Sequence, residues 1–437
     1  MAGAVKQLKG IAQAVASLEV CIVALAVAGS IASIELLPVA VGVAGVFWIV
    51  RWVAYGYASR RTALDLPILF LVLLLPVTLL VTALPQKTFP QVLRLLSGIG
   101  LYYSLVNWVN SELRFRLASI AMVLVGIGLC IFAPFSVEWE IAKVPFLPAS
   151  LYERFDPIVV DTVNPNVMAG SLAILMPFAF GLSLSNWQGR GKWQTVLGGF
   201  GLVLMAGVLL LTQSRGAWLA SGLALLVVIT LRWRWGWVLM LFMAILAGGI
   251  LYSMGTFTVL EALSRSTTLG GLAGRMEVWS RALYMIRDFP ITGIGMGSFE
   301  EVADLLYPFF LFEPGKIEHA HNLFLQVAVD LGVPGLAAWV ICLVMATICA
   351  WRIYQPRSNR TEWLTGVAAG LVGSQVALAV HGVIDAVTWG IVRPAPLVWA
   401  LWGLAVAGIR LRQDKPSDSG RLSSKPMSNM SQGGVPG

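Results

Sequence analysis

Apolar stretches of membrane-spanning length alternate with short polar segments along most of the chain. A transmembrane helix needs about 20 mostly apolar residues, because the hydrocarbon core is about 30 Å thick and a helix rises about 1.5 Å per residue. Twelve stretches meet this requirement, at 11–33, 36–55, 66–84, 92–109, 115–135, 163–184, 196–211, 216–231, 236–254, 333–350, 364–384 and 394–409. The pattern predicts an all-α polytopic membrane protein with about 12 transmembrane helices.

Two segments between the predicted spans are long enough to hold a functional site. One covers 136–162, and the other, 255–332, is the largest hydrophilic insertion and precedes the tenth span. The longer segment contains helical spacing of its own, at Met276, Trp279, Leu283 and Ile286 and again at Leu323, Val327, Val329 and Leu331. A loop of this length is usually functional rather than a connector. We expect a large, partly helical outer loop.

Composition supports a membrane protein and argues against several other classes. Of 437 residues, 58% are hydrophobic and 12% are charged, whereas soluble domains carry about 25% charged residues. The net charge of +8 is spread in short clusters between apolar stretches, so we predict no nucleic-acid partner. The four cysteines lie in apolar runs without metal-type spacing, and we therefore predict neither a disulfide framework nor a zinc site.

The basic residues predict the orientation in the membrane. Alternate loops on one side carry Lys6, Lys9, Arg51, Arg60, Arg61, Arg114, Arg116, Arg190, Lys192, Arg232, Arg234, Arg352, Arg357, Arg360, Arg410 and Arg412. That side is cytoplasmic by the positive-inside rule, which places both termini inside. The first apolar run is longer than a signal-peptide core, so we expect an uncleaved anchor. The polar tail 413–437 lacks apolar residues and is predicted to be disordered.

Arg215 lies in a short polar break, Thr212-Gln213-Ser214-Arg215-Gly216, between two apolar runs at the outer surface. An arginine at this position either snorkels to the interface or binds a ligand. A guanidinium group grips phosphate oxygens with a planar fork and stays protonated. We therefore consider Arg215 a candidate anion clamp, with interfacial snorkelling as the alternative.

The long loop supplies a second candidate for anion binding. Arg275 begins a helical run behind glycines, and anions favour helix starts. Arg281 is six residues further on and need not face the same site, so we prefer Arg275, with a surface salt bridge as the alternative. The run of glycines at 293–297 lacks a preceding strand and full dinucleotide spacing, so we predict a tight turn there.

Histidines are rare in this chain, and two of the three, His319 and His321, occur together just before Asn322 and an apolar helix. A histidine can take a proton from a hydroxyl near neutral pH, which suggests an acid/base role. A metal site and a purely structural role are the alternatives, although no pattern completes a metal site. His381 and Asp385, at helical spacing at the outer end of a late span, either support the site or pair within the bundle.

Two further features have simpler interpretations. Asn164-Pro165-Asn166 opens the sixth span and is typical of a helix start, with asparagine as the cap and proline in the first turn. Glu19 and Glu35 lie in or near the first spans. A carboxylate within a membrane is a functional hypothesis by default, but the sequence suggests no partner for either.

Taken together, these motifs carry a family resemblance. Asn-Pro-Asn166 and Ser-Arg215-Gly each start a span, Gly-Arg275 lies in the large outer loop, and His-Asn322 leads into Leu-Gly-Val-Pro-Gly335. In order, spacing and sidedness the sequence resembles the O-antigen ligase and polymerase family over roughly 159–392, and His381 and Asp385 fit the late part of the pattern.

The resemblance implies a function. Members of the family move a glycan from undecaprenyl diphosphate to an acceptor hydroxyl on the outer face of the inner membrane, without nucleotide sugar, metal or other cofactor. Carried over, Arg215 and Arg275 would hold the diphosphate and His321 would assist the acceptor. His319, Asn322, Arg281, Asn166, His381 and Asp385 are possible supporting residues. The presence of His319 two residues before His321 leaves the identity of the base open.

The resemblance also divides the chain. It implies N-terminal helices and a first outer loop at 1–158, a ligase/polymerase-like region at 159–392 with a periplasmic loop at 255–332, a last span at 393–412 and a cytoplasmic tail at 413–437. Within the family the acceptor can be lipid A core, a second lipid-linked glycan or a protein side chain. A transporter of a small anion such as bicarbonate is an alternative. A transporter would carry polar residues at the membrane midplane, whereas in this chain they concentrate at the predicted outer rim. A non-catalytic membrane scaffold is another alternative.

Overall fold

The computed structural model describes residues 2–139, 150, 152, 155, 158, 162–184, 192–254, 272–355 and 362–413. Within these ranges the named elements are all helices, and the pairing between Val137 and Val163 is an isolated bridge. The elements are α1 (Ala2–Ser17), α2 (Glu19–Ala32), η1 (Ile34–Leu36), α3 (Leu37–Tyr55), α4 (Asp65–Val81), α5 (Pro85–Trp108), α6 (Glu112–Ser136), α7 (Pro165–Ser183), α8 (Lys192–Leu211), α9 (Arg215–Arg232), α10 (Gly236–Met254), α12 (Leu272–Asp288), α13 (Phe299–Leu306), α14 (Leu323–Tyr354), α15 (Glu362–Ile384) and α16 (Ala395–Gln413). The predicted all-α class is confirmed.

Each predicted span is helical, but not all of the helices have full membrane length. In the described ranges, seven helices are long and apolar enough to cross a membrane: α3 with η1, α6, α7, α8, α9, α14 and α15. The helices α4, α10 and α16 are apolar but have shorter described apolar segments. The chain is thus a polytopic membrane protein, and the number of 12 spans stays a prediction.

The predicted first span is not one straight helix. It breaks next to Leu18 into α1 and α2, which are bent by 49°. Behind the break, Glu19 forms an ion pair with Arg51 of α3, and both side chains are almost fully buried. This pair supplies the partner for Glu19 that the sequence did not suggest, and the pairing makes the burial of both charges tolerable.

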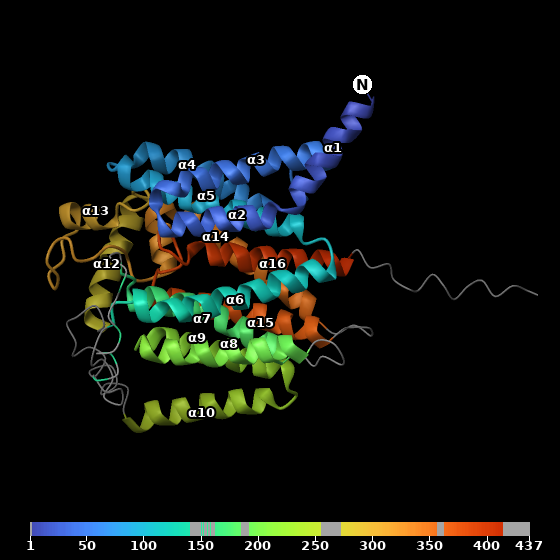
Figure 1. Ribbon diagram of the computed structural model, residues 1–437. Coiled ribbons are helices and arrows are strands. Elements are labelled where there is room, and N and C mark those ends of the chain that lie inside the picture. The colour runs from blue at the N-terminus through green and yellow to red at the C-terminus, as the bar shows by residue number, and fades with distance from the viewer. Residues whose placement is uncertain are drawn as a thin grey trace, which may run out of the picture.

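The spans lie side by side, with α14, α15 and α16 in the middle of the bundle (Figure 1). The most buried span is α7, followed by α15, with 78% and 72% of their apolar windows buried. The two backbones touch: a Cβ atom on Gly181 would lie 2.4 Å from the carbonyl oxygen of Gly366 and 2.6 Å from Gly370. Small residues allow this approach, because association in lipid depends on close packing rather than on the hydrophobic effect.

The outer loop forms a small helical layer at one end of the bundle (Figure 1). The predicted helix at its centre is confirmed as α12, but its buried face differs from the expected one. Val278, Ala282 and Met285 are fully buried, whereas Met276 and Leu283 are more than half exposed. Both sets of apolar residues fit helical spacing. The set with Val278, Ala282 and Met285 is the buried one because it packs against Phe299 and Ala303 of α13.

The predicted second helix of the loop is the beginning of α14. It is separated from the following span by Gly332, whose φ of 73° is non-helical. The backbone N–H of Val333 donates to the carbonyl of Pro290 at 2.8 Å, which holds the break against the end of the α12 region. Residues 323–331 therefore belong to the outer layer and continue into the span below.

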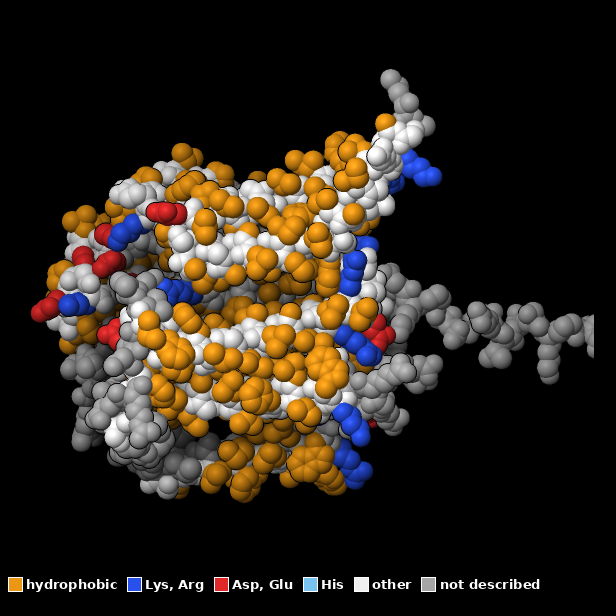
Figure 2. Space-filling view, in the orientation of Figure 1, with side chains coloured by type: hydrophobic (Ala, Val, Ile, Leu, Met, Phe, Trp, Pro, Cys, Tyr) orange, Lys and Arg blue, Asp and Glu red, His pale blue; other side chains and the backbone are white. Residues whose placement is uncertain are grey.

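Figure 2 shows an apolar side surface between two polar ends, as expected of a bilayer belt. Lys and Arg side chains gather at the end from which the N-terminus emerges, and the acidic side chains gather mainly at the end with the outer layer. This separation agrees with the basic loops that the sequence places on one side.

Candidate active site

Segments far apart in the chain meet at the end of the bundle that carries the outer layer. The C-terminal end of α15, at Ile384, is the meeting point. Arg275 of α12 donates a hydrogen bond to the carbonyl oxygen of Ile384. Gly216, in the first turn of α9, lies against the Ile384 side chain, with its Cβ position 2.6 Å from Ile384 Cγ2. The starts of α9 and α12 are therefore fixed beside the residue that precedes Asp385.

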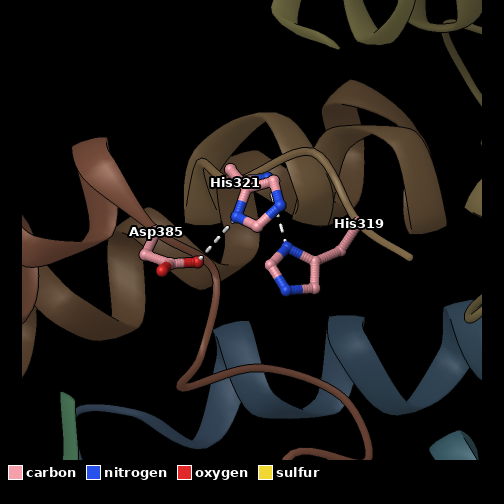
Figure 3. Close-up of side chains that lie close together, drawn as sticks. All are labelled: His319, His321 and Asp385. Atoms are coloured by element: carbon pink, nitrogen blue, oxygen red, sulfur yellow. Dashed lines mark hydrogen bonds and ion pairs between the residues drawn. The ribbon is translucent and has the colours of Figure 1, made fainter. Parts of the chain in front are cut away.

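His319, His321 and Asp385 form a histidine–aspartate cluster at this point (Figure 3). The Nδ1 atom of His321 lies 3.3 Å from Oδ1 of Asp385. The backbone N–H of His321 donates to Nδ1 of His319 at 3.2 Å, and the two rings are 4.2 Å apart between centroids. Asp385 is 4% exposed, whereas the His321 side chain remains 16% exposed. The cluster thus has a buried acid and an accessible imidazole.

The hydrogen bonds indicate which ring nitrogen carries the proton in neutral His321 and His319. An ionised carboxylate only accepts hydrogen bonds, so the proton on neutral His321 lies on Nδ1 and leaves Nε2 with a free lone pair. His319 is the opposite tautomer, because its Nδ1 accepts from a backbone N–H and its proton must lie on Nε2. His321 is therefore arranged to accept a proton, and His319 to donate a hydrogen bond.

Electrostatics reinforce this assignment. Burial works against ionisation of Asp385, but the hydrogen bond from His321 and the surrounding histidines outweigh it and hold the pKa of this carboxyl below its usual range. Burial, with the neighbouring His321, lowers the pKa of His319 to about 4. At neutral pH His319 is uncharged and Asp385 is ionised.

The backbone is held in an uncommon conformation at two places near the site. Among the described non-glycine residues, positive φ occurs at His321 (45°) and Gln213 (53°). Such conformations cost free energy and persist where surrounding contacts enforce them. Gln213 is held by a hydrogen bond from its side chain to the Tyr152 hydroxyl at 2.8 Å, and it shapes the turn that leads into Arg215. Both strained residues thus position candidate site residues.

Arg275 and Arg215 bring positive charge to the neighbourhood of the cluster. Arg215 is exposed and is the first residue of α9. Burial lowers the pKa of Arg275, Asp385 opposes this shift, and the charge of Arg215 adds to it. The two guanidinium groups therefore interact electrostatically. Two cations beside a buried carboxylate suit a multiply charged anion.

His381 and Asn322 support this arrangement from within the protein. His381 is 2% exposed and lies against α7, where a Cβ on Gly170 would come within 3.2 Å of its ring. Asn322 caps α14 by accepting hydrogen bonds from two backbone N–H groups, and its amide donates to the carbonyl of Val383 at 3.0 Å. Asn322 therefore ties the segment that holds His321 to the end of α15.

Two further predicted supporting residues, Arg281 and Asn166, have structural contacts of their own. Arg281 pairs with Glu277 at 3.4 Å, donates to the carbonyl of Pro308 and covers the Phe310 ring, so it holds the outer layer together. At the start of α7, Asn164 caps the helix by accepting the backbone N–H of Asn166 at 2.8 Å. The helix-start interpretation of this motif is confirmed.

A cavity of about 430 Å³ adjoins the cluster at His319. The carboxylate of Asp330 reaches it from α14 and accepts from the side chains of Gln326 at 2.9 Å and Trp389 at 2.8 Å. The glycine turn predicted at 293–297 closes one side, with Gly297 in the lining. Sequence reasoning missed Asp330, although an aspartate in the apolar run 323–331 is a signal that could have identified it.

The cluster also has the geometry of a metal site. One ligand atom from each of His319, His321 and Asp385 lies within 4.8 Å of the others. Imidazole and carboxylate groups suit zinc and other transition metals. The nearby charges of Arg215 and Arg275 oppose a divalent cation, however, and favour an anion at the same place.

Part of the chain is similar to a known protein family. Residues 200–340 match the family model described as O-antigen ligase. Over this stretch, which is less than half of the chain, the protein is similar to O-antigen ligases. The matched stretch includes Arg215, Arg275, His319 and His321, and it ends before Asp385.

A curated relative points in the same direction. The exopolysaccharide production protein ExoQ of Rhizobium meliloti (strain 1021) is 27% identical over 191 residues. The similarity covers 40% of this chain and 42% of the relative, so the chain spans less than half the length of the protein it matches. The chain is thus a polytopic membrane protein that is similar, over part of its length, to an O-antigen ligase model and to an exopolysaccharide production protein.

Proposed function

We propose that the protein transfers a glycan from undecaprenyl diphosphate to an acceptor hydroxyl at the periplasmic face of the inner membrane. The observation that carries this proposal is the convergence of Arg215 and Arg275 beside the His321–Asp385 pair. Diphosphate-linked donors need positive charge at the leaving group, and acceptor hydroxyls need a base. The contacts of Arg275 and Gly216 with Ile384, next to the Asp385 partner of His321, support the presence of both kinds of group at this end of the bundle.

Arg215 and Arg275 hold the diphosphate in this proposal. As the bond from the anomeric carbon to the diphosphate oxygen breaks, its electron pair stays on the diphosphate and negative charge grows there. Fixed guanidinium groups stabilise this charge without having to reorganise. Arg275 is already fixed by its hydrogen bond to Ile384, which preorganises the cation before the donor arrives.

His321 acts as the base in this proposal. The acceptor oxygen attacks the anomeric carbon opposite the leaving diphosphate, a new glycosidic bond forms, and the hydroxyl proton passes to Nε2 of His321. Asp385 keeps Nδ1 protonated and stabilises the imidazolium that forms. The transfer needs no oxidant, nucleotide sugar or metal, and the proton returns to water when the products leave.

His319 orients the acceptor in this proposal. Its Nε2–H is a hydrogen-bond donor, and His319 lines the cavity. The pKa of His319 is lowered to about 4. His319 is therefore a weak base and does not take the acceptor proton in place of His321. In this proposal His321 is the base and His319 is not.

The proposed acceptor is a growing polysaccharide. The name of the relative, an exopolysaccharide production protein, supports a polysaccharide product, and a lipid-core ligase or a protein glycosylation enzyme would differ in the acceptor alone. The separation of Lys and Arg at one end of the bundle supports cytoplasmic termini and a periplasmic site (Figure 2).

A complementation experiment tests the function. The gene is deleted, and surface polysaccharide is compared by gel and lipid-linked precursor by mass spectrometry, with rescue by wild type, His321→Ala or the control variant Arg281→Ala. We expect precursor accumulation and loss of polymer in the deletion, rescue by wild type and Arg281→Ala, and no rescue by a stably expressed His321→Ala. Unchanged glycans in every strain would refute the transferase and favour transport of a small anion.

A further inference from the structure

A second pocket, of about 570 Å³, lies between α7, α9 and α10. Its lining includes Phe180, Leu184, Ile229, Arg232, Trp233 and Leu239. Arg232 is the last residue of α9, whose first residue, Arg215, belongs to the candidate active site. An α-helix of 18 residues is about 27 Å long, so this pocket lies at the opposite end of the bundle and takes no part in the proposed glycan transfer.

The pocket combines apolar walls with one guanidinium group. Arg232 is half-buried, and its Nη2 donates to the carbonyl oxygen of Leu184, just after the end of α7, at 3.0 Å. Its Nε is buried and has no hydrogen-bond partner among the described residues. None of the described residues that line the pocket is acidic. A cation at low exposure without a carboxylate beside it is stabilised when an anion binds there.

The mouth of the pocket lies at the depth of the lipid head groups. Trp233 and Trp235 are about half exposed, and the Arg234 guanidinium lies 5.0 Å from the centroid of the Trp235 ring. Tryptophan side chains of this kind gather where the bilayer meets water. Figure 2 shows Lys and Arg side chains at this end of the molecule. The pocket is therefore at the height at which a phospholipid carries its phosphate.

The pocket borders the bilayer through α10. This helix packs against α9 and lies at the edge of the bundle (Figure 1). Its large apolar side chains at 240–242 are exposed, as expected of a surface in contact with lipid. A lipid can therefore reach the space between α10 and α7 from the side, with its chains in the apolar region and its head group at Arg232.

We propose that this pocket binds one anionic phospholipid from the leaflet at the basic end of the bundle. The phosphate accepts hydrogen bonds from Arg232, since guanidinium groups pair well with phosphate oxygens. One acyl chain lies against Phe180, Ile229 and Leu239. Basic pockets between transmembrane helices are typical binding sites for anionic head groups. A zwitterionic lipid brings the same phosphate with a cation, which the positive charges of Arg232 and Arg234 repel.

Lipid binding by the full-length protein tests this site. The purified protein is freed of lipid in detergent and titrated with phosphatidylglycerol or phosphatidylcholine, and bound lipid is counted by native mass spectrometry. We expect one tightly bound phosphatidylglycerol and at least about tenfold weaker binding of phosphatidylcholine. Loss of a charge-assisted hydrogen bond in Arg232→Gln should weaken phosphatidylglycerol binding by about tenfold or more. Equal affinities for the two lipids in wild type would refute the site.

Arg114→Gln is the matched control. Arg114 is also half-buried and also donates to a backbone carbonyl at 3.0 Å, that of Trp108, but it does not line the pocket. The control should bind phosphatidylglycerol as wild type does, and equal weakening in both variants would contradict a role for the pocket. Arg232→Lys keeps the charge and should keep the preference for the anionic lipid, whereas loss of that preference in a folded protein would refute the electrostatic argument.

Two measurements identify what occupies the pocket. Excess inorganic phosphate should not displace the lipid, because it lacks the chains that contact the apolar walls; displacement would show an anion site without specificity for lipid. Phosphatidylglycerol with a photoreactive acyl chain should label peptides of α7, α9 and α10 in wild type and much less in Arg232→Gln. Equal labelling of all lipid-facing helices would show ordinary bilayer contact and refute a specific site.

Discussion

The Asp385→Asn variant tests the central electrostatic argument with little change in shape. Asp385 accepts hydrogen bonds from the backbone N–H of Ala386 at 2.8 Å and from His321 at 3.3 Å. Asparagine retains an oxygen for Ala386 but removes the negative charge. The imidazolium that forms when His321 takes the acceptor proton then loses its stabilising partner, while the ground state is altered much less.

The magnitude follows from the change in hydrogen-bond type. A hydrogen bond to a charged group contributes about 1.5–3 kcal/mol, against about 0.5–1.5 kcal/mol for a neutral one. With the added loss of direct attraction in the transition state, we expect a penalty of about 2–3 kcal/mol, which slows kcat by about 30- to 150-fold. KM for the donor should change little, because Arg215 and Arg275 remain.

The assay is the initial rate of polymer formation by purified protein in nanodiscs, with thermal unfolding measured in parallel. Asp288→Asn is the matched control, because Asp288 lies on the same outer layer but is paired with Arg287 and Tyr307 away from the cluster. The control should retain its rate. A folded Asp385→Asn protein with the wild-type rate would refute the proposed pairing of base and carboxylate.

Three further predictions follow from other contacts. Arg215→Lys should lose at least about tenfold in rate, because an ammonium group lacks the planar fork that grips a diphosphate; a wild-type rate would show that charge alone is enough. Chelators should leave transfer unchanged, and inhibition that is reversed by added zinc would instead assign the histidine–aspartate cluster to a metal. Arg51→Leu should destabilise the protein by about 3–5 kcal/mol, since it leaves Glu19 buried without its partner; thermal unfolding should show a much smaller loss for the double variant with Glu19→Leu, and equal losses would contradict the argument.

The apolar pattern was sufficient for the fold class and for the positions of the helices. A helix in a bilayer satisfies its own backbone hydrogen bonds, so each apolar stretch could be assigned without knowledge of its neighbours. Residue types at neighbouring positions were also sufficient to predict the helix start at Asn164 and the glycine turn at 293–297. It did not find the break beside Leu18 or the buried face of α12, because both depend on what packs against these helices.

The candidate site was only partly accessible from the sequence. Arg215, Arg275 and His321 stood out because charged and titratable groups are conspicuous beside apolar runs. Their convergence around Ile384 depends on contacts between residues more than 100 positions apart, such as that of Arg275 with the Ile384 carbonyl. No periodic pattern encodes such a contact.

What the sequence determined by itself was local: where helices form, which side of the membrane carries positive charge, and which few residues can do chemistry. The tertiary structure decided the rest, because roles depend on distance. It placed Asp385 beside His321, which puts the proton of the neutral imidazole on Nδ1, and it placed Arg281 in the outer layer. Electrostatic interactions and hydrogen bonds act over a few ångströms in space, whatever the separation along the chain.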